Sequence, residues 1–500
     1  MHRLPLPEAE AALGDELSTV RPDLSAAYAA GIPGTRAAVL TRLWRALAHE
    51  PLPWIARRER GREGLTLHLA DGRRLHGPHA DPYATSAYVT ELRLDERAYD
   101  RPDRLVTALA GPHASGFATE LGHSVASLAL SRAQPGPSGG EPAASWEWEQ
   151  RVLDGHPYHP NCRSRPGFSV AEQLAYGPEH RPVVELGLVP VDDCLVRGEW
   201  PKWLRDEDRV LIPVHPWQAA HVLDRGHQEG FSAHPLMSLR TLALPDGPHV
   251  KTALSARLTS SVRDISVYSI ETSATVSAFA EEIAARTDGL LHVTRTLGAV
   301  SAHSPALAAV LREAPDLYAR AGERVVPVAA LAATGLPRSP GWTARFARLA
   351  LTVGLRLLDL GVALEAHGQN LLVVLSAEGE PLRLVYRDLA DIRVSPLRLA
   401  RHGIAAPRMS GRIVTDDATT LRRKLFGSLV AGALGATAGS AAALREDLGS
   451  AVDDLPRTAD LAALLEEPLP TKALTLMRLE PGTPGDSWAC LPNPFTDRAS

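Results

Sequence analysis

Cysteine is scarce in this sequence. Cys162, Cys194 and Cys490 are the only cysteines among 500 residues, too few and too scattered for a disulfide framework or a cysteine-rich zinc site. Such scarcity is typical of a protein that works in a reducing cytoplasm, which is the location we predict. The first residues, MHRLPLPEAEAAL, place prolines and glutamates where a secretory signal needs an unbroken apolar stretch.

Long apolar runs and long basic blocks are missing as well. The longest weakly polar run, residues 427–444, is mainly Ala, Gly, Ser and Thr, so we interpret it as a buried, closely packed helix and predict no membrane contact. The formal net charge is −5 and no long block of Lys and Arg occurs, which excludes a general nucleic-acid binder. No Walker A motif is present, so a P-loop nucleotide site is excluded too.

The remaining composition is that of a globular chain with several domains. Hydrophobic residues make up 45% and charged residues 22% of the sequence, and 500 residues exceed what one hydrophobic core organises. Two stretches rich in Pro and Gly, residues 134–144 and 335–341, indicate domain boundaries. We therefore predict domains at residues 1–135, 136–338 and 339–500, with small molecules as partners.

One stretch, residues 251–266 (KTALSARLTSSVRDIS), combines three cations with many hydroxyl side chains and one carboxylate. If it is a strand running into a turn, Lys251 and Arg257 share a face, which Thr259 and Arg263 continue. Guanidinium, ammonium and hydroxyl groups together suit a polyanionic small molecule. A solvated basic edge is the alternative interpretation.

The segments on either side extend this prediction. Residues 238–241 (SLRT) place two hydroxyls and a guanidinium just before the cationic stretch. Strands carrying Ser238, Arg240, Lys251, Thr259 and Arg263 would form one wall of an anion pocket. After it, residues 265–278 and 290–300 are rich in β-branched side chains, and we predict strands there.

Two motifs, GHPYHP (residues 155–160) and HPWQ (residues 215–218), contain histidines that are each followed by proline. Proline favours an extended conformation in the preceding residue and stiffens the loop. With Arg163 and Arg165, the pair His156 and His159 predicts a donor-rich loop that faces a phosphate. A partial zinc site that includes Cys162 and a purely structural turn remain as alternatives.

The last third of the sequence predicts a helix and a hairpin. An amphipathic pattern runs from Trp342 to Leu360, and Gly361 is the expected stop. Then EAHGQN (residues 365–370) leads into two apolar strands that end at Asp388. The hairpin would bring Asn370 and Asp388 face to face, a donor pair that suits Mg²⁺. Protein kinases use a similar arrangement, by analogy only, and polar caps on a surface hairpin are the alternative.

Taken together, these motifs resemble a known family. GHPYHP, HPWQ, SLRT, KTALSARLTSSVRDIS, EAHGQNLL and the late KALTLMRL resemble, in order, the motifs of the NRPS-independent siderophore (NIS) synthetases, the IucA/IucC family. The resemblance covers about residues 150–492. This chain departs from the family pattern at Arg163, where lysine is usual, and at residues 389–391, where a sequence that contains glycine is usual.

The resemblance implies an α+β fold with several domains in a thumb, fingers and palm architecture. The thumb would be residues 1–135, the fingers residues 136–338 with an antiparallel sheet, and the palm residues 339–500, which would be helical and loosely kinase-like. It also implies a homodimer.

The activity implied by the resemblance is ATP-dependent ligation. Citrate or a related polycarboxylate would be adenylated with Mg²⁺ present, and an amine or alcohol would then displace AMP. The implied catalytic residues are Lys251, Arg263 and His367, and the acid would contact Thr259, Arg263, His367 and Lys472. ATP would contact His156, His159, Arg163, Arg165, Ser238, Arg240, Thr241, Lys251, Glu365, Gln369 and Asn370, and the metal Asn370 and Asp388.

Two other functions remain open at this point. A kinase-like phosphotransferase would use the same nucleotide site but release ADP. A non-enzymatic protein that binds citrate or a ferric siderophore would need no nucleotide.

Overall fold

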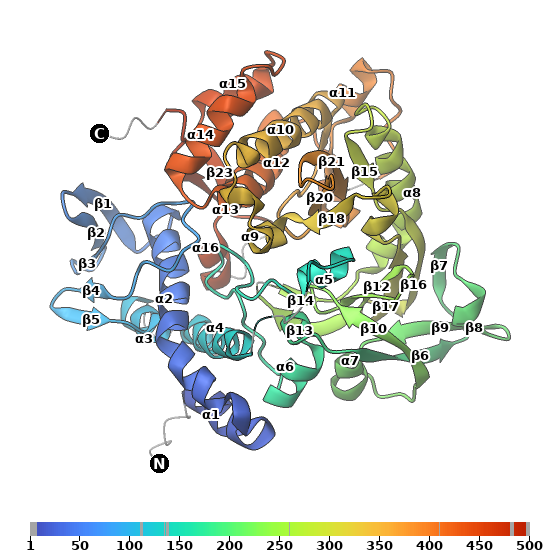
Figure 1. Ribbon diagram of the computed structural model, residues 1–500, viewed down its shortest axis with the longest axis horizontal. Coiled ribbons are helices and arrows are strands. Elements are labelled where there is room, and N and C mark those ends of the chain that lie inside the picture. Colours follow the sequence, from blue (N-terminus) through green and yellow to red (C-terminus); the bar gives the residue numbers. More distant parts are fainter. Residues whose placement is uncertain are drawn as a thin grey trace.

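The computed structural model has a mixed α+β fold with mostly antiparallel sheets, and it describes residues 8–110, 114–134, 136, 140–259, 261–409, 411–480 and 485–496. The predicted boundary at residues 135 and 136 falls partly outside these ranges. Figure 1 shows three groups of elements in chain order: N-terminal helices with a small sheet, a large central sheet, and C-terminal helices around a second sheet.

The N-terminal part packs long helices beside a five-stranded antiparallel meander. Strands β2 and β3 form a hairpin, and Gly72 in the connecting turn has φ +91°. The elements are α1 (Ala9–Val20), α2 (Ser25–His49), β1 (Ile55–Gly61), β2 (Gly64–Leu69), β3 (Arg74–Gly77), β4 (Leu92–Leu94), β5 (Arg97–Tyr99), α3 (Pro102–Ala110) and α4 (Ser115–Ala133).

The central part is a nine-stranded sheet with the order β7-β16-β17-β12-β11-β10-β6-β9-β8. Its strands are β6 (Val184–Val191), β7 (Leu195–Gly198), β8 (Arg205–Asp206), β9 (Arg209–Val214), β10 (Gln228–Pro235), β11 (Thr241–Ala243), β12 (His249–Thr252), β16 (Thr296–Ser304) and β17 (Leu307–Arg312). Three short helices flank it, α5 (Ser145–Glu149), α6 (Val170–Tyr176) and α7 (Pro216–His221). A separate two-stranded hairpin of β13 (Leu254–Leu258) and β14 (Ser261–Arg263) follows β12.

The C-terminal part places helices around a four-stranded sheet with the order β15-β21-β20-β18. The strands are β15 (Leu291–Val293), β18 (Arg324–Pro327), β20 (Leu371–Leu375) and β21 (Pro381–Tyr386). Two separate two-stranded sheets accompany it: β19 (Val362–Ala363) pairs with β22 (Arg393–Val394), and β23 (Leu469–Lys472) pairs with β24 (Trp488–Leu491). The helices are α8 (Val267–Ala284), α9 (Leu331–Thr334), α10 (Trp342–Leu360), α11 (Pro396–Arg401), α12 (Ala418–Leu425), α13 (Gly435–Ala438), α14 (Ala441–Val452), α15 (Ala459–Glu466) and α16 (Leu474–Leu479).

The predicted helix from Trp342 to Leu360 is confirmed as α10, and Gly361 ends it with φ +100°. A residue without Cβ is favoured at this position because the left-handed conformation is strained for other residues. The predicted hairpin after residue 370 is confirmed as β20 and β21.

The prediction of strands over residues 265–278 is wrong, because α8 begins at Val267. The Ser266 hydroxyl caps this helix by accepting a hydrogen bond from the Ser269 backbone N–H at 3.2 Å. Ile270, Phe279 and Ile283 then face the core at helical spacing. Tertiary burial of that face outweighs the strand preference of the β-branched side chains.

The apolar run at residues 427–444 is buried in part, as predicted, but it is not a single helix. Residues Phe426–Leu434 form a π-helical segment, α13 follows, and Gly439 (φ +76°) breaks the chain before α14. In the described part of the chain no single helix is long and apolar enough to span a membrane. Two segments, residues 418–438 and 441–452, together have the length and composition of a span, but the chain bends by 116° between them.

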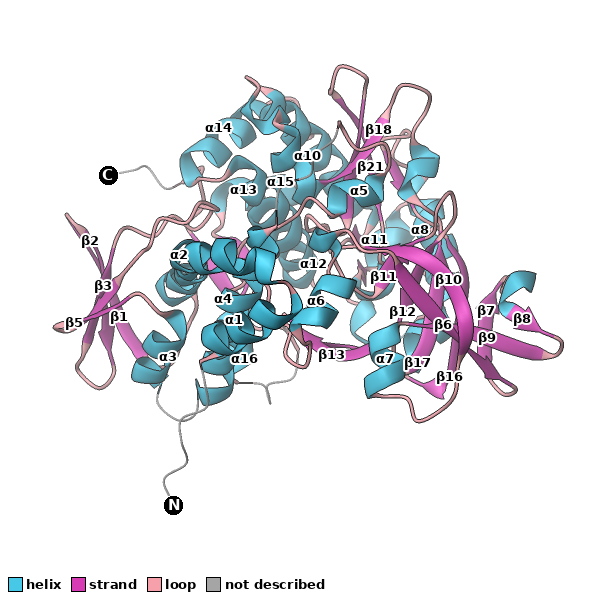
Figure 2. Ribbon diagram, turned by 60° about the horizontal axis from the view of Figure 1, so that its bottom comes forward, coloured by secondary structure: helices cyan, strands magenta, loops and turns pink. Residues whose placement is uncertain are grey.

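Separate hydrophobic cores lie in the three parts, and Figure 2 shows the N-terminal sheet and the large central sheet at opposite ends of the molecule. The C-terminal core also takes in Phe279 and Ile283 from α8, which precede the predicted boundary at residue 339. Leu476 and Leu479 of α16 pack against the N-terminal core. The chain therefore returns at its end to the part where it began.

Candidate functional site

An ion pair between Lys251 and Asp388 lies at the centre of the candidate site. Lys251 is on β12, and its Nζ donates to both carboxylate oxygens of Asp388 at 2.9 and 2.8 Å. Asp388 follows β21 with a left-handed φ of 73°, which turns its carboxylate toward the central sheet. Arg312, at the end of the neighbouring strand β17, lies 3.8 Å from the same carboxylate.

The charges in this cluster perturb one another. Burial lowers the pKa of Lys251 to about 7; Asp388 opposes this shift, and Arg240 and Arg312 add to it. Burial would raise the pKa of Asp388, but Lys251 and Arg312 outweigh it and hold that pKa far below its usual value. The carboxylate is therefore ionised, while the lysine proton is held weakly.

The predicted SLRT segment forms the turn that leads into β11, beside this cluster. Thr241 pairs directly with Lys251 across the β11–β12 ladder. The Ser238 hydroxyl accepts a hydrogen bond from the Thr241 backbone N–H at 3.1 Å, and Leu239 between them has φ +62°. Arg240 donates to the Asp264 carbonyl at 3.2 Å, and burial lowers its pKa to about 10.

The hairpin of β13 and β14 brings Arg263 to the site, but it does not bring Arg257. Arg263 donates to the Leu258 carbonyl at 3.0 Å, and its pKa is lowered by burial and raised by Asp388 and Glu365. Arg257 is exposed, whereas Lys251 is 8% exposed, so the expected shared face is wrong. The reason is that the chain leaves the large sheet after β12 and pairs in a new two-stranded sheet.

Thr259 lies in the turn of this hairpin with φ +58°. Its backbone N–H donates to the Ser164 carbonyl at 3.5 Å, which connects the hairpin to the loop that follows GHPYHP.

The histidines of GHPYHP and HPWQ share one local geometry. In His156, His159 and His215, ring Nδ1 accepts a hydrogen bond from the backbone N–H two residues later, at 2.9 to 3.1 Å. His367 does the same with the Gln369 N–H at 3.3 Å. An accepting Nδ1 places the proton of a neutral ring on Nε2, so each of these side chains presents one N–H donor.

Burial favours the neutral form of these rings. Burial lowers the pKa of His159 to about 3, with further lowering by Arg478 and Arg263, and it also lowers the pKa of His367. The Nε2 atom of His159 is buried and has no hydrogen-bond partner within the described ranges. His156 and His159 lie edge to face with ring centroids 6.0 Å apart.

Arg163 and Arg165 do not lie in a free, donor-rich loop. Both are buried and form ion pairs with Glu179, at 3.2 and 2.8 Å, and Glu179 is itself fully buried. Arg163 also donates to the carbonyls of Leu153 and Val152. The sequence analysis expected both guanidiniums to face a phosphate and did not foresee the buried carboxylate that pairs with both of them.

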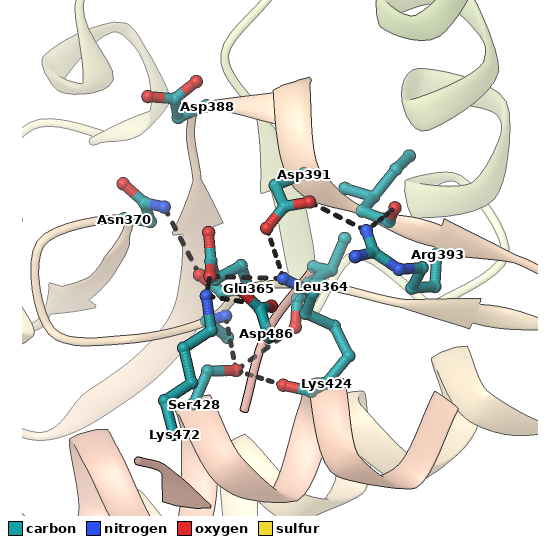
Figure 3. Close-up of polar contacts among 12 residues, drawn as sticks. Leu364, Glu365, Asn370, Asp388, Asp391, Arg393, Lys424, Ser428, Lys472 and Asp486 are labelled. Atoms are coloured by element: carbon teal, nitrogen blue, oxygen red, sulfur yellow. Dashed lines mark hydrogen bonds and ion pairs between the residues drawn. The ribbon is translucent and has the colours of Figure 1, made fainter. Parts of the chain in front are cut away.

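A second ion cluster surrounds Glu365, as Figure 3 shows. Lys472 of β23 and Lys424 of α12 lie 2.8 and 3.2 Å from one oxygen of Glu365. Lys424 also pairs with Asp391 at 2.5 Å. Burial would raise the pKa of Glu365, but Lys472 and Lys424 outweigh it and hold that pKa below its usual value.

The π-helical segment positions the loop that carries Glu365. Its Ser428 hydroxyl accepts a hydrogen bond from the Ala366 backbone N–H at 2.9 Å and donates to the Lys424 carbonyl at 2.7 Å. π-Helical turns are rare and frequently occur at functional sites. This one fixes Ala366, and with it the neighbouring Glu365 and His367.

Asn370 and Gln369 complete the loop. The Asn370 side-chain amide donates to the Glu365 carbonyl at 3.3 Å, and its backbone carbonyl accepts from Arg387 N–H at 3.0 Å. The Gln369 carbonyl accepts from the Arg387 guanidinium at 2.8 Å. The two ends of the hairpin are therefore adjacent, as the sequence predicts.

The predicted Mg²⁺ donors, Asn370 and Asp388, fit the metal by chemistry because one carboxylate and one amide oxygen are hard oxygen ligands. Among the described residues, no group of three or more His, Cys, Asp or Glu side chains could hold a metal ion. Since Asp388 already pairs with Lys251, a metal ion here would need further oxygen ligands from a bound anion.

Several residues of the site were missed by the sequence analysis. They are Glu149, Glu179, Arg312, Asp391 and Lys424, which hold the predicted residues in place. Arg312 ends a strongly apolar strand, a signal that could have been noticed. The acidic residues stand in ordinary helical or loop sequence, and only tertiary contacts reveal them.

The fold and the site define an α+β protein in which cations gather around two carboxylates, Asp388 and Glu365. Residues 144–333 match the model of the IucA/IucC family, and residues 341–486 match the model described as ferric iron reductase FhuF-like transporter. Over residues 144–333 the chain is therefore similar to the IucA/IucC family.

Several curated relatives are named as synthases or ligases. The chain is 26% identical to the citryl-spermidine/3,4-dihydroxybenzoyl-citryl-spermidine:spermidine ligase of Bacillus anthracis, over 49% of this chain and 51% of that protein. It is 23% identical to staphyloferrin A synthase of Staphylococcus aureus, over 54% of this chain and 55% of that protein. The chain thus spans about half the length of the curated relatives it matches.

Solved structures share the fold over almost the whole chain. The petrobactin biosynthesis protein AsbB from Bacillus anthracis str. Sterne has a TM-score of 0.75 at 18% identity, covering 98% of each chain. ATP-bound aerobactin synthetase IucA from Klebsiella pneumoniae has a TM-score of 0.69 at 20% identity, covering 92% of this chain and 99% of that chain.

Proposed function

We propose that this protein is an ATP-dependent siderophore synthetase that adenylates citrate or a related polycarboxylate and condenses it with an amine or alcohol. The observation that carries the proposal is the juxtaposition of two cationic clusters, one around Asp388 and one around Glu365, with Arg263 and His367 electrostatically coupled to both carboxylates. Two polyanions, ATP and the acid, need such a site to approach each other.

The Asp388 cluster supports binding of the triphosphate. Lys251, Arg240 and Thr241 lie together on and beside the β11–β12 ladder, and Ser238 holds the turn next to them. Phosphate oxygens would replace Asp388 as partners of Lys251. Asn370 and the released Asp388 would then hold Mg²⁺, which neutralises triphosphate charge when bound.

The Glu365 cluster supports binding of the acid. Thr259, Arg263, His367 and Lys472 would contact its carboxylates, with Arg263 and His367 nearest the reacting one. A carboxylate oxygen attacks the α-phosphorus of ATP, and pyrophosphate leaves as that bond forms. The nucleophile then attacks the acyl carbon, loses its proton and displaces AMP, giving an amide or an ester.

The proposal includes the architecture and setting of the family. The N-terminal part acts as the thumb, the large sheet as the fingers and the C-terminal part as a loosely kinase-like palm. The protein works as a cytoplasmic homodimer, without nucleic acid or membrane partners.

The experiment that tests this function is product analysis with ATP, Mg²⁺, hydroxylamine and a panel of citrate, 2-oxoglutarate and succinate. Release of AMP and pyrophosphate with one acid, together with its hydroxamate, is the expected result. ADP as the nucleotide product would indicate a phosphotransferase instead. Binding of citrate without nucleotide turnover would indicate a binding protein.

A further inference from the structure

A pocket adjoins the Glu365 cluster and shares Lys424 with it. It has a volume of about 340 Å³ and is lined by residues of β22, α12 and the segments before α12 and β24, among them Arg393, Arg412, Arg423, Lys424, Asp486 and Trp488. Lys424 belongs to both places, because its Nζ pairs with Glu365 at 3.2 Å while its side chain lines the pocket. A molecule in this pocket would therefore lie next to the proposed acid site.

The lining of this pocket is strongly cationic. Asp486 is the one carboxylate that lines it, and this carboxylate faces Lys472 at 3.3 Å. Asp391 lies behind the lining and is shared among Lys424 at 2.5 Å, Arg393 at 2.8 Å and Arg412 at 3.5 Å. Even with Glu365 and Asp486 counted beside Asp391, these carboxylates are fewer than the cations around them, so positive charge remains for a ligand. The cations are Arg393, Arg412, Arg423, Lys424 and Lys472.

The buried and exposed cations have different positions. Lys424 and Arg393 are 2% and 8% exposed, so their charges are poorly screened by water. Arg412 and Arg423 are exposed at the rim, where the Arg412 side chain is 68% accessible. An anion that enters the pocket would meet the exposed guanidiniums of Arg412 and Arg423 first and the buried cations further in.

The remaining wall is apolar and firmly held. Trp488 packs on the π-helical segment so closely that a Cβ on Gly427 would lie 2.9 Å from its ring. Val414 and the hydroxyl residues Thr415 and Thr420 complete the lining. The pocket thus combines an anion-binding side with a short apolar surface, which suits a small molecule that has both a carboxylate and a methylene chain.

We propose that this pocket binds the amine co-substrate through a carboxylate, so that the nucleophile is an amino acid and not a di- or polyamine. This inference rests on the proposed function, since it assigns the second substrate of the same site. A polyamine would bring cations against four lining cations and is disfavoured by charge repulsion. An amino acid would pair its carboxylate with these cations and extend its side-chain amine toward Lys424 and the acyl group.

The test compares amines that differ only by a carboxylate, with the acid identified by the hydroxylamine assay. The pairs are lysine and 1,5-diaminopentane, ornithine and 1,4-diaminobutane, and 2,3-diaminopropionate and 1,2-diaminoethane. Each condensation rate is divided by the hydroxylamine-driven rate of the same preparation, which removes differences in adenylation or folding. We expect the amino acid of the productive pair to react at least about tenfold faster than its diamine. This factor corresponds to the free energy of one charge-assisted contact with the carboxylate.

Variants assign this preference to the pocket. Arg412→Gln and Arg423→Gln should each reduce the ratio of amino acid to diamine, mainly through a higher KM for the amino acid. The matched control is Arg401→Gln, which removes an exposed cation outside the pocket lining and should keep the wild-type ratio.

The outcomes separate this inference from the proposed function. A wild-type enzyme that prefers the diamine, or variants that both keep the wild-type ratio, would overturn the inference while adenylation stands. If the variants raise only the KM for ATP or only the KM for the acid, the pocket binds another ligand and the inference is overturned. Absence of AMP release with every acid would overturn the proposed function, and this inference with it.

Discussion

Glu149 and Arg387 form an ion pair, with Arg387 Nη1 2.7 Å from Glu149 Oε1, although the two residues are 238 positions apart in the sequence. The second oxygen of Glu149 accepts a hydrogen bond from the Met237 backbone N–H at 3.0 Å. One buried carboxylate therefore fixes both the turn before Ser238 and the residue before Asp388. Figure 1 shows its helix, α5, between the central sheet and the C-terminal elements, and Trp146 on that helix stacks on His234 of β10 at 4.0 Å.

Glu149→Gln should destabilise the fold and weaken ATP binding together. The substitution leaves the buried Arg387 without its counter-charge, which we expect to lower the free energy of unfolding by about 3 kcal/mol. Urea unfolding followed by circular dichroism measures this loss. Glu147→Gln, a half-buried neighbour on the same helix, is the matched control and should cost less than about 1 kcal/mol.

A double variant tests whether the ion pair is the cause. Adding Arg387→Met to Glu149→Gln removes the uncompensated charge, so part of the lost stability should return. Fully additive losses in the double variant would show that the two side chains do not act as a pair.

The affinity for ATP should fall as pH rises above about 7, because burial lowers the pKa of Lys251 to about 7. Below that pH the ammonium is charged and can pair with the triphosphate. Above it the proton must be taken up on binding, so the KM for ATP should rise up to about tenfold per pH unit. Initial rates at constant free Mg²⁺ measure this dependence.

Lys251→Arg and Lys251→Met serve as opposite controls for the pH effect. Arginine stays protonated and should give a low KM that does not change across this range, whereas methionine should give a high KM that is equally independent of pH. The same pH dependence in either variant as in the wild type would assign the effect to another group.

Arg263→Ala should reduce hydroxamate formation about 100-fold while the fold stays intact. It removes a charge-assisted contact to the reacting carboxylate, worth roughly 1.5 to 3 kcal/mol. Arg257→Ala is a matched control, because it removes an exposed cation from the same hairpin. Near-normal turnover in Arg263→Ala, or an equal loss in both variants, would contradict the assignment.

Asp388→Asn should raise the Mg²⁺ concentration needed for half-maximal activity about tenfold or more, since a carboxylate is a stronger ligand than an amide. A Mg²⁺ titration at saturating ATP measures the change. Asp454→Asn, whose side chain is 70% exposed, removes the same charge at a distance from the site. An unchanged titration in Asp388→Asn would remove this residue from the metal site.

Local sequence predicted the elements that depend on neighbours in the chain. The helix Trp342–Leu360 with Gly361, the hairpin of β20 and β21, and the stiff histidine loops follow from periodicity, glycine and proline. Local preference failed at α8, where burial of one helical face overrides β-branched residues. It also failed for Arg257, because alternation along a strand holds only while the chain stays in one sheet.

Residue type and order are enough to define the motifs, the cationic stretch at residues 251–266 and the resemblance to a family. Which carboxylate pairs with each cation depends on the tertiary structure. Glu179 takes up Arg163 and Arg165 inside the protein, whereas Lys251 reaches Asp388 across 137 residues of chain. The physical reason is that a charge is neutralised by whatever the fold brings within a few ångströms of it, and that distance is not encoded in any local pattern.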